Sequence, residues 1–407
     1  MNRKKLFLWS LYDFANSIVF INFLLYFSQW LVVDRGLSDF WYNASFAIST
    51  LLLLLIAPVL AARTDRQGGR LRWLRIATCG TAFCYGAAAI SASLDGALGV
   101  VVVFFLLAQF FYQLCFVFYN PMIEDIANEQ HRTRASGIGQ FANALGQVAG
   151  ILALRPLAHS RLAPLLPAVG AFLILALPML LMYEESGRHE VKDPSEGSQR
   201  DSGPWRRLAR LVTVSTAAPL LVAFFLYNDA LITVTNNYSI YMDRVFGLPD
   251  STKAIFLLAI VVTNAIGALL SGWLGDRFGP FRTLQGVLLC WCVALPLIAL
   301  SHSLNVFAAT TFVLGALIGA MWATSRSYMS LLLPSREMGY GFSFYTILER
   351  CSSFVGPLTW GAVMAGLGTS ETSYRTALGL MTVFVVSGLM ILSLWRPSGD
   401  VHLRKVS

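Results

Sequence analysis

The chain has 407 residues, of which 56% are hydrophobic and only 13% are charged, and its formal net charge is +8. Because soluble domains usually carry about 25% charged residues, this composition excludes an ordinary water-soluble protein. A helix needs roughly 20 mostly apolar residues to cross a bilayer. The sequence contains twelve stretches of this kind, at 6–33, 38–62, 73–94, 97–121, 135–157, 162–183, 212–240, 252–275, 282–301, 304–333, 340–367 and 373–395. We therefore expect an all-α membrane protein with twelve transmembrane helices.

The positive charges indicate how the chain is oriented. With an even number of spans both termini lie on one side of the membrane, and 22 of the 30 Lys and Arg residues fall on that side, against six on the other. By the positive-inside rule this bias predicts that both termini are cytoplasmic, and we expect the inner membrane of a bacterium as the location. The positive net charge is thus explained by membrane topology, and it does not indicate nucleic-acid binding. The first apolar stretch is too long for a cleavable signal and lacks a small-residue cleavage site, so we expect it to remain as the first span.

The residue types that usually carry catalysis form no recognisable set. The six cysteines all fall within predicted spans without zinc-type spacing, and the five histidines are scattered over loops and ends. HExxH, GxSxG and a phosphate-binding glycine loop are absent from the sequence. We therefore expect no enzyme activity, no metal and no cofactor. We also expect a monomer whose partners are a small solute, a proton or other coupling ion, and the lipid bilayer.

The sequence repeats itself once. The hydrophilic segment 184–210 is rich in charge, Ser, Gly and Pro and separates six predicted spans from six, which predicts a flexible cytoplasmic linker between bundles at 1–183 and 211–407. Each half carries the pattern D-R-x-G after its second span, as Asp65-Arg66-x-Gly68 and Asp276-Arg277-x-Gly279. Two copies in equivalent loops indicate parallel repeats of six spans, a plan that transporters use.

Both loops resemble the signature G-x-x-x-D-R-x-G-x-[RK] of the major facilitator superfamily; the second copy keeps the leading glycine as Gly272, whereas the first has Ala61. Longer strings resemble one branch of that superfamily; they are "YDFANS" (12–17), "VFYNPMIEDIANEQHRTRASGIG" (117–139), "FLYNDA" (225–230), "SRSYMSLLLP" (325–334) and "GFSFYTILERCSSFVGP" (341–357). The chain is therefore similar to the unknown-major-facilitator family, which includes the autophagy-related vacuolar amino-acid effluxer. The resemblance implies a secondary-active transporter built from two pseudo-symmetric six-helix bundles, with amino-acid export as the hint of substrate. It also implies that helices 1, 4, 7 and 10 line a central cavity, while helices 2, 5, 8 and 11 join the halves.

Polar residues at helical spacing point to a path through the protein. Residues three, four and seven apart share one face of a helix, and the first, fourth, fifth and seventh spans carry polar faces of this kind. We expect the path of the substrate or proton to include Asp13, Asn16, Gln113, Asn228, Asp229, Arg326, Glu349 and Arg350.

Three charged residues on this path each have two possible roles. A carboxylate inside the bilayer costs at least ~2.5 kcal/mol on insertion scales, so Asp13 either lines a cavity or gate, or ties two helices together. Asp229 is nearer the middle of its span and is either a proton carrier or a hydrogen-bonded brace at the break of a discontinuous helix. Arg326 either contacts a substrate carboxylate or pairs with Asp13 or Glu349, and Arg350 is expected to anchor the two halves.

The superfamily resemblance also assigns a gating role to the signature loops, at Asp65, Arg66, Gly68, Arg70, Asp276, Arg277 and Gly279. In the superfamily the aspartate is thought to face a helix N-terminus of the other half, where the macrodipole favours an anion. Two other classes of function stay open: a facilitator without ion coupling, and a membrane sensor or scaffold that keeps the fold but moves nothing. The buried carboxylates favour coupling over facilitation, and a sensor would be expected to carry a longer soluble domain.

Overall fold

The computed structural model describes residues 2–67, 69–127, 129–185, 217–332, 345, 348–349 and 352–395, which form helices and short connections without a strand. The side chains at 61–62, 65–67, 124, 129–134, 136–137, 276 and 330 lie outside this description. The longer helices are α1 (Arg3–Asn22), α2 (Asp39–Gln67), α3 (Arg70–Ser93), α4 (Leu98–Tyr119), α6 (Glu129–Leu154), α7 (Leu165–Met182), α9 (Ala218–Phe246), α10 (Asp250–Phe278), α11 (Pro280–Leu300), α12 (Leu304–Leu332), α14 (Val355–Leu367) and α15 (Glu371–Leu394). Shorter pieces are η1 (Phe23–Phe27), η2 (Trp30–Asp34), η3 (Asn120–Met122), α5 (Ile123–Ile126) and η4 (Arg155–Leu157).

The helices account for every predicted span. Ten segments of the described chain are long and apolar enough to cross a membrane, counting α1 together with η1 and η2 as one. The fifth and eleventh predicted spans correspond to α6, which is rich in polar residues, and to α14, which is apolar but only 13 residues long. The multi-pass, all-helical fold predicted from composition is therefore confirmed.

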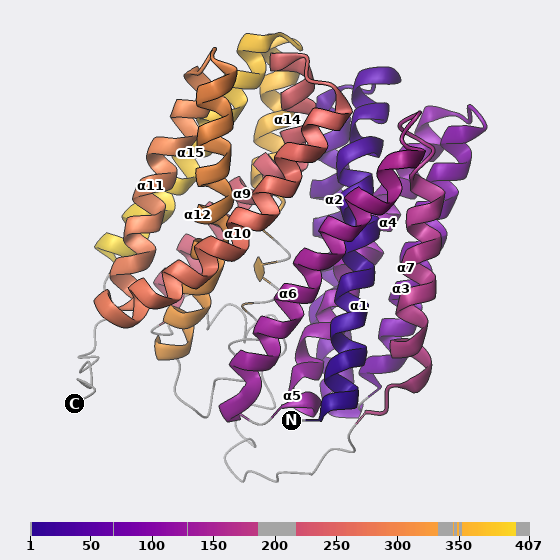
Figure 1. The fold of residues 1–407 in the computed structure, drawn as a ribbon, viewed down its shortest axis with the longest axis vertical. Helices are drawn as coiled ribbons and strands as arrows, with labels where there is room; N and C mark the ends of the chain where they lie inside the picture. The colour runs from indigo at the N-terminus through magenta and orange to yellow at the C-terminus, as the bar shows by residue number, and fades with distance from the viewer. Residues whose placement is uncertain are drawn as a thin grey trace.

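The helices form two groups that lie side by side (Figure 1). In the first group α1 packs on α6 and α7, and α3 packs on α4; in the second, α9 packs on α15 and α12 packs on α10 and α11. The groups meet where α2 contacts α14 and where α6 contacts α10. These are the second, fifth, eighth and eleventh spans, which the superfamily resemblance assigned to the junction. We call the two groups the N half and the C half.

The chain direction defines two ends of the bundle. The N-terminus lies at one end (Figure 1), which we call the near end. α1 and α9 run from the near end to the opposite, far end, and α2 and α10 run back. The links between α1 and α2 and between α9 and α10 therefore lie at the far end.

Glycine allows the closest helix contacts. A Cβ atom at Gly146 of α6 would lie 2.2 Å from the carbonyl oxygen of Phe14 in α1, and one at Gly267 of α10 would lie 1.9 Å from that of Ala316 in α12. Small residues at such crossings let helix backbones approach in membrane proteins, where packing rather than water exclusion drives association. Each half thus contains at least one crossing that only glycine permits.

The first span is not a plain α-helix. After Asn22 it continues through the π-helical segments η1 and η2 as one apolar run, Arg3–Asp34. Within it the Ser28 hydroxyl donates to the Leu24 carbonyl at 2.7 Å, and the Gln29 amide donates to the Leu25 carbonyl. π-helical turns of this kind occur frequently at functional sites, and the apolar pattern of the sequence did not predict them.

The eleventh span is interrupted. The sequence predicted one span over 340–367, but residues 352–354 are not helical and α14 begins at Val355. The apolar stretch at 340–367 is therefore not one continuous helix among the described residues. Pro357 favours a helix start at this point, because it lies in the first turn of α14, where a missing N–H is tolerated.

Candidate functional site

Asp229 of α9 holds the break in the eleventh span. Its side chain is fully buried, and Oδ2 accepts a hydrogen bond of 2.7 Å from the backbone N–H of Gly356, in the first turn of α14. A helix N-terminus favours an anion because its first N–H groups have no partner within the helix. The second oxygen, Oδ1, has no hydrogen-bond partner among the described residues. The geometry thus matches the brace that the sequence offered as one of two roles for Asp229.

The break also contacts the other half. Ser353, just before α14, shares a hydrogen bond of 2.6 Å between its hydroxyl and that of Thr50 in α2, and both residues are buried. The same short segment is therefore bound by the C half through Asp229 and by the N half through Thr50. Any relative movement of the two halves must change one of these two contacts.

Asn228, beside Asp229, braces three helical segments of the C half. Its Oδ1 accepts from the indole N–H of Trp322 in α12 at 3.0 Å, and its Nδ2 donates to the backbone carbonyl of Glu349 at 3.2 Å. Arg326 lies one turn beyond Trp322 and is half-buried. The predicted Arg350 lies outside the described residues. Three of the predicted C-half residues, Asn228, Arg326 and Glu349, therefore belong to one region, and the side-chain amide of Asn228 is already engaged there.

Asp13 ties α1 to α6 within the N half. Its Oδ1 accepts a hydrogen bond of 2.8 Å from Asn143, and the Oδ1 of Asn143 accepts one of 2.8 Å from Gln147. Asp13 is buried, whereas Asn143 and Gln147 are half-buried. The polar stripe predicted on the fifth span thus forms a hydrogen-bonded chain that leads from a buried carboxylate to a more accessible amide. The contact fits the helix tie, and the pathway role of Asp13 stays a prediction.

Two buried amides of the predicted pathway keep unused hydrogen-bonding capacity. Asn16 of α1 is fully buried, and neither its Oδ1 nor its Nδ2 has a partner among the described residues. Gln113 of α4 donates from Nε2 to the Ser49 hydroxyl at 3.2 Å, but its Oε1 has no partner in the same part of the chain. Leaving a buried polar group unpaired costs about 1–3 kcal/mol, so each such group calls for a water or a ligand. Asn16 and Gln113 are the predicted pathway residues best suited to bind one.

The structure describes the signature loops in part. Asp65 and Arg66 lie in the last turn of α2 and Asp276 lies in α10, but their side chains are outside the description, and so is Gly68 altogether. Arg70 opens α3 and donates to the backbone carbonyl of Pro121 at 3.2 Å, within its own half.

The second copy ends in a tight turn. The guanidinium of Arg277 is exposed and lies over the rings of Trp273 and Phe278, at 5.6 and 5.5 Å from their centroids. Gly279 has φ +85°, a conformation that side chains disfavour, and links α10 to α11. The backbone conformation at Gly279 therefore explains why a glycine occupies this position of D-R-x-G. The gating role of both loops stays a prediction.

One residue at the first signature loop escaped the sequence reasoning. Glu185, three residues after the end of α7, accepts hydrogen bonds from the backbone N–H of Gly69 at 3.1 Å and from that of Leu71 at 2.6 Å. Its carboxylate thus caps the N-terminus of α3, where the macrodipole favours a negative charge. An acidic residue at the end of the sixth span was the available signal, but the sequence gave no indication that this end lies beside the loop at 65–70.

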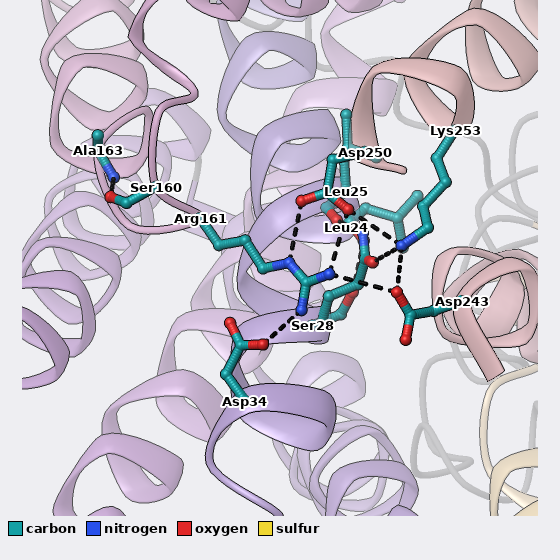
Figure 2. A network of polar contacts seen from close by, with 11 residues as sticks. Leu24, Leu25, Ser28, Asp34, Ser160, Arg161, Ala163, Asp243, Asp250 and Lys253 are labelled. Atoms are coloured by element: carbon teal, nitrogen blue, oxygen red, sulfur yellow. Dashed lines mark hydrogen bonds and ion pairs between the residues drawn. The ribbon is translucent and has the colours of Figure 1, made fainter. Parts of the chain in front are cut away.

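A cluster of charges at the far end also escaped it. Arg161 lies between η4 and α7 and forms ion pairs with Asp34, Asp243 and Asp250, and Lys253 pairs with the latter two (Figure 2). Arg161 and Lys253 are two of the six positive charges that the sequence places on the side opposite the termini. Lys253 could have indicated the cluster from the sequence, because it lies at the start of an apolar span where Asp250 is the nearest acidic residue.

Comparison with known proteins decides the family. Residues 133–398, about two thirds of the chain, match the family model described as "Vacuole effluxer Atg22 like". The chain belongs to this family. Among curated relatives of this Atg22-like chain is an uncharacterised MFS-type transporter, YxiO, of Bacillus subtilis (strain 168), with 22% identity over 95% of this chain and 93% of the relative. Another is autophagy-related protein 22 of Eremothecium gossypii, with 24% identity over 63% of this chain and 54% of the relative.

Solved structures confirm the fold of this Atg22-like protein. A bacterial homologue of the human lysosomal transporter Spinster, in an inward-facing and unoccupied conformation, aligns over 97% of both chains with a TM-score of 0.75 at 15% identity. The major facilitator transporter FucP, in an outward conformation, aligns over 95% of this chain and 97% of its own with a TM-score of 0.64 at 15% identity. The resemblance stated from the sequence motifs is thus confirmed, and the protein is an MFS-type transporter rather than an enzyme.

Proposed function

We propose that this transporter is a secondary-active carrier that moves a small solute by alternating access between its two halves, coupled to a proton or another ion. Amino acids are the first class of cargo to test, in the direction of export, because the family model is that of a vacuole effluxer. We place it as a monomer in a bacterial inner membrane with both termini in the cytoplasm.

The observation that carries this proposal is the interrupted eleventh span. Non-helical backbone at membrane depth is tolerated only where protein buries it or where it lines a water-filled cavity. In transporters, discontinuous helices form the sites for substrate and coupling ions. Here the break lies between Asp229 of one half and Thr50 of the other, at the junction that alternating access must rearrange.

Asp229 is our candidate for the coupling group. An ionised carboxylate accepts the N–H of Gly356 more strongly than a protonated one, because hydrogen bonds to charged acceptors are roughly twice as strong as neutral ones. Protonation of Asp229 would therefore loosen the attachment of α14 to α9. Proton binding to Asp229 and movement of the junction would in this way be coupled through the hydrogen bond between Asp229 and Gly356. Asn16 and Gln113, with their unpaired amide groups, are the candidates for contact with the solute.

The experiment has two stages. Purified protein is screened by thermal shift against amino acids, small peptides and organic cations, because a ligand that binds the folded state raises its stability by mass action. The hits are then followed in proteoliposomes by counterflow, and by accumulation with and without an imposed pH gradient.

The outcomes separate the function classes. A carrier shows counterflow, and a coupled carrier accumulates solute only when a gradient is present. Flux without any response to ion gradients would identify an uncoupled facilitator, and binding without flux would identify a sensor or scaffold. Asn16→Ala is expected to abolish the thermal shift by the ligand. The control is Ser17→Ala on the same helix, whose buried hydroxyl donates to the backbone carbonyl of Asp13 and which should retain the ligand response.

A further inference from the structure

The far end of the protein holds five charged side chains in one cluster (Figure 2). Arg161 comes from the loop before α7, in the N half, and reaches the C half at two points: Nε lies 2.9 Å from Asp250 Oδ2, and Nη2 lies 3.3 Å from Asp243 Oδ1. Its Nη1 lies 2.6 Å from Oδ1 of Asp34, which belongs to its own half. One guanidinium therefore bridges three carboxylates and both halves.

Lys253 shares two of those carboxylates. Its side chain is fully buried, and Nζ lies 2.5 Å from Asp243 Oδ1 and 3.0 Å from Asp250 Oδ1. All three residues belong to the C half. Nζ also donates to the amide oxygen of Gln29, which is the only contact that Lys253 makes with the N half among the hydrogen bonds of the described residues.

The cations differ in how they are held. Burial alone would lower the pKa of Arg161, but hydrogen bonding to Asp250 and the charges of Asp250, Asp34 and Asp243 outweigh it and raise that pKa above its usual value. Arg161 therefore stays charged at every physiological pH. Its side chain is 18% exposed, whereas that of Lys253 is 0% exposed. The arginine approaches the cluster from outside, and the lysine forms its interior.

We propose that this cluster is a gate that holds the far end closed, in which Arg161 is the cation that leaves when the halves separate and Lys253 is the cation that stays. The proposal rests on the alternating-access function proposed above. Separation divides the cluster along the boundary between the halves. Arg161 keeps Asp34, and Lys253 keeps Asp243 and Asp250.

This division explains why the cluster needs two cations. Removing one partner of a buried ion pair is strongly unfavourable, because it leaves an uncompensated charge. With Lys253 present, departure of Arg161 leaves both carboxylates of the C half beside a permanent counter-ion. Arg161 is also not left unpaired, because it keeps Asp34. The ion pairs between Arg161 and the C half can therefore break and re-form in each cycle.

Uncharged side chains near the cluster also join the two halves. Asn43 and Asn237 exchange side-chain hydrogen bonds of 2.9 and 2.7 Å between α2 and α9, and the Tyr42 hydroxyl donates to the backbone carbonyl of Asn236 at 2.9 Å. Asn236 itself is buried and lines a small cavity with Phe20, Phe105 and other aromatic side chains of the N half. A thiol at position 236 would therefore report whether the far end is open.

The test measures how fast that thiol reacts from the far side. An Asn236→Cys reporter is placed in a chain whose six native cysteines are replaced by Ser or Ala. Oriented vesicles are treated with a membrane-impermeant maleimide added only to the far side. Arg161→Ala is expected to speed labelling at least about tenfold, because loss of one partner of a buried charge pair usually shifts an equilibrium by that much or more.

Two variants test the division of roles. Lys253→Met should label no faster than the parent, because opening would then leave Asp243 and Asp250 without a counter-ion. Gln29→Ala removes the contact of Lys253 with the N half and should speed labelling less than Arg161→Ala does, because Lys253 still keeps both carboxylates of its own half. Gln29→Ala also keeps the test decisive where Lys253→Met does not fold.

The matched control is Arg35→Ala. Arg35 pairs with Asp95 at 2.9 Å at the same end of the bundle, but both residues belong to the N half. This variant removes the same charge without touching the junction and should label at the parent rate. Melting temperature and gel-filtration profile establish that each variant is folded.

Three results would overturn the proposal. An unchanged rate in a folded Arg161→Ala variant would show that the cluster does not hold the far end closed. Acceleration by Lys253→Met or Gln29→Ala equal to that of Arg161→Ala would show that both cations act as bridges. Acceleration by Arg35→Ala would show a general charge effect. Labelling needs no cargo, so these results are independent of the transport assays, and a protein that opens without carrying solute would fail only the latter.

Discussion

The carboxylate of Asp229 accepts the backbone N–H of Gly356 at 2.7 Å, and the two residues are 127 positions apart in the chain. This one bond attaches the start of α14 to the middle of α9. It gives a buried acid a structural role, and it places the charge state of that acid at the junction of the two halves. The consequences for coupling and for stability can be separated by choice of substitution.

Asp229→Asn keeps an acceptor oxygen but cannot release a proton. We expect this variant to fold, to exchange solute at equal pH on both sides, and to lose accumulation driven by a pH gradient. The measurement is counterflow and gradient-driven uptake in proteoliposomes. Accumulation at the parent level would remove Asp229 as the carrier and leave Glu349 as the next candidate.

Asp229→Ala also removes the acceptor. A buried N–H that loses a charged acceptor costs about 1–3 kcal/mol, so this variant should melt at a lower temperature than Asp229→Asn. Thermal unfolding in detergent checks the difference. Equal melting temperatures would mean that the bond to Gly356 contributes nothing to the attachment of α14.

Gly356→Ala tests the same junction from the other side. A Cβ atom at this position would lie 2.2 Å from the Thr233 hydroxyl oxygen and 3.0 Å from Asp229 Oδ1. We expect a loss of about 1–3 kcal/mol of stability, which is typical of overpacking, together with impaired transport. Gly170→Ala in α7 is the control, since its Cβ would meet no atom within 4 Å. A Gly356→Ala variant as stable as this control would contradict the packing argument.

Asp13→Asn is expected to weaken solute binding or gating while sparing the fold. An amide at this position can still accept a hydrogen bond from Asn143, so the tie between α1 and α6 is retained while the charge is lost. Ligand-induced thermal shift and counterflow measure the effect. Arg326→Ala should have the same effect if the two charges pair in another state, and full binding in both variants would leave Asp13 as a helix tie only.

Asp65→Asn tests the signature loop. If this aspartate holds the near end closed, the variant should fold while cavity cysteines become more accessible from the near end. Unchanged accessibility with full transport would make Asp65 an ordinary loop residue. Glu185→Ala provides a comparison, because loss of its cap on α3 should cost about 1 kcal/mol and loosen the same loop through its backbone.

The predicted topology has a direct test. A reporter fused after Lys405 and a thiol label placed in the segment 184–210 should both report the cytoplasmic side, because Lys and Arg are concentrated there. The N-terminus should report the same side. A C-terminus on the outer side would contradict the count of twelve spans.

The sequence by itself determined the multi-pass, all-helical architecture, the order of the spans and the family. A lipid-exposed span must be mostly apolar and must satisfy its backbone hydrogen bonds internally, so most spans can be recognised from hydrophobic length along the chain. The repeated D-R-x-G marks the two halves without any knowledge of contacts. The polar residues within those spans could be found in the same way, because a charge in an apolar run stands out. What Asp229 or Asp13 contacts could not be read, since their partners lie 127 and 130 residues away.

Only the tertiary structure decided where the eleventh helix breaks and which charges meet at the far end. Ser352, Ser353 and Gly356 are compatible with a helix one by one, and the break follows from Pro357 together with an acceptor supplied by α9. Arg161 and Lys253 resemble ordinary charges at span ends until folding brings them to the same two carboxylates. Ion pairs depend on distances across the fold, and hydrophobic periodicity along one chain carries no information about those distances.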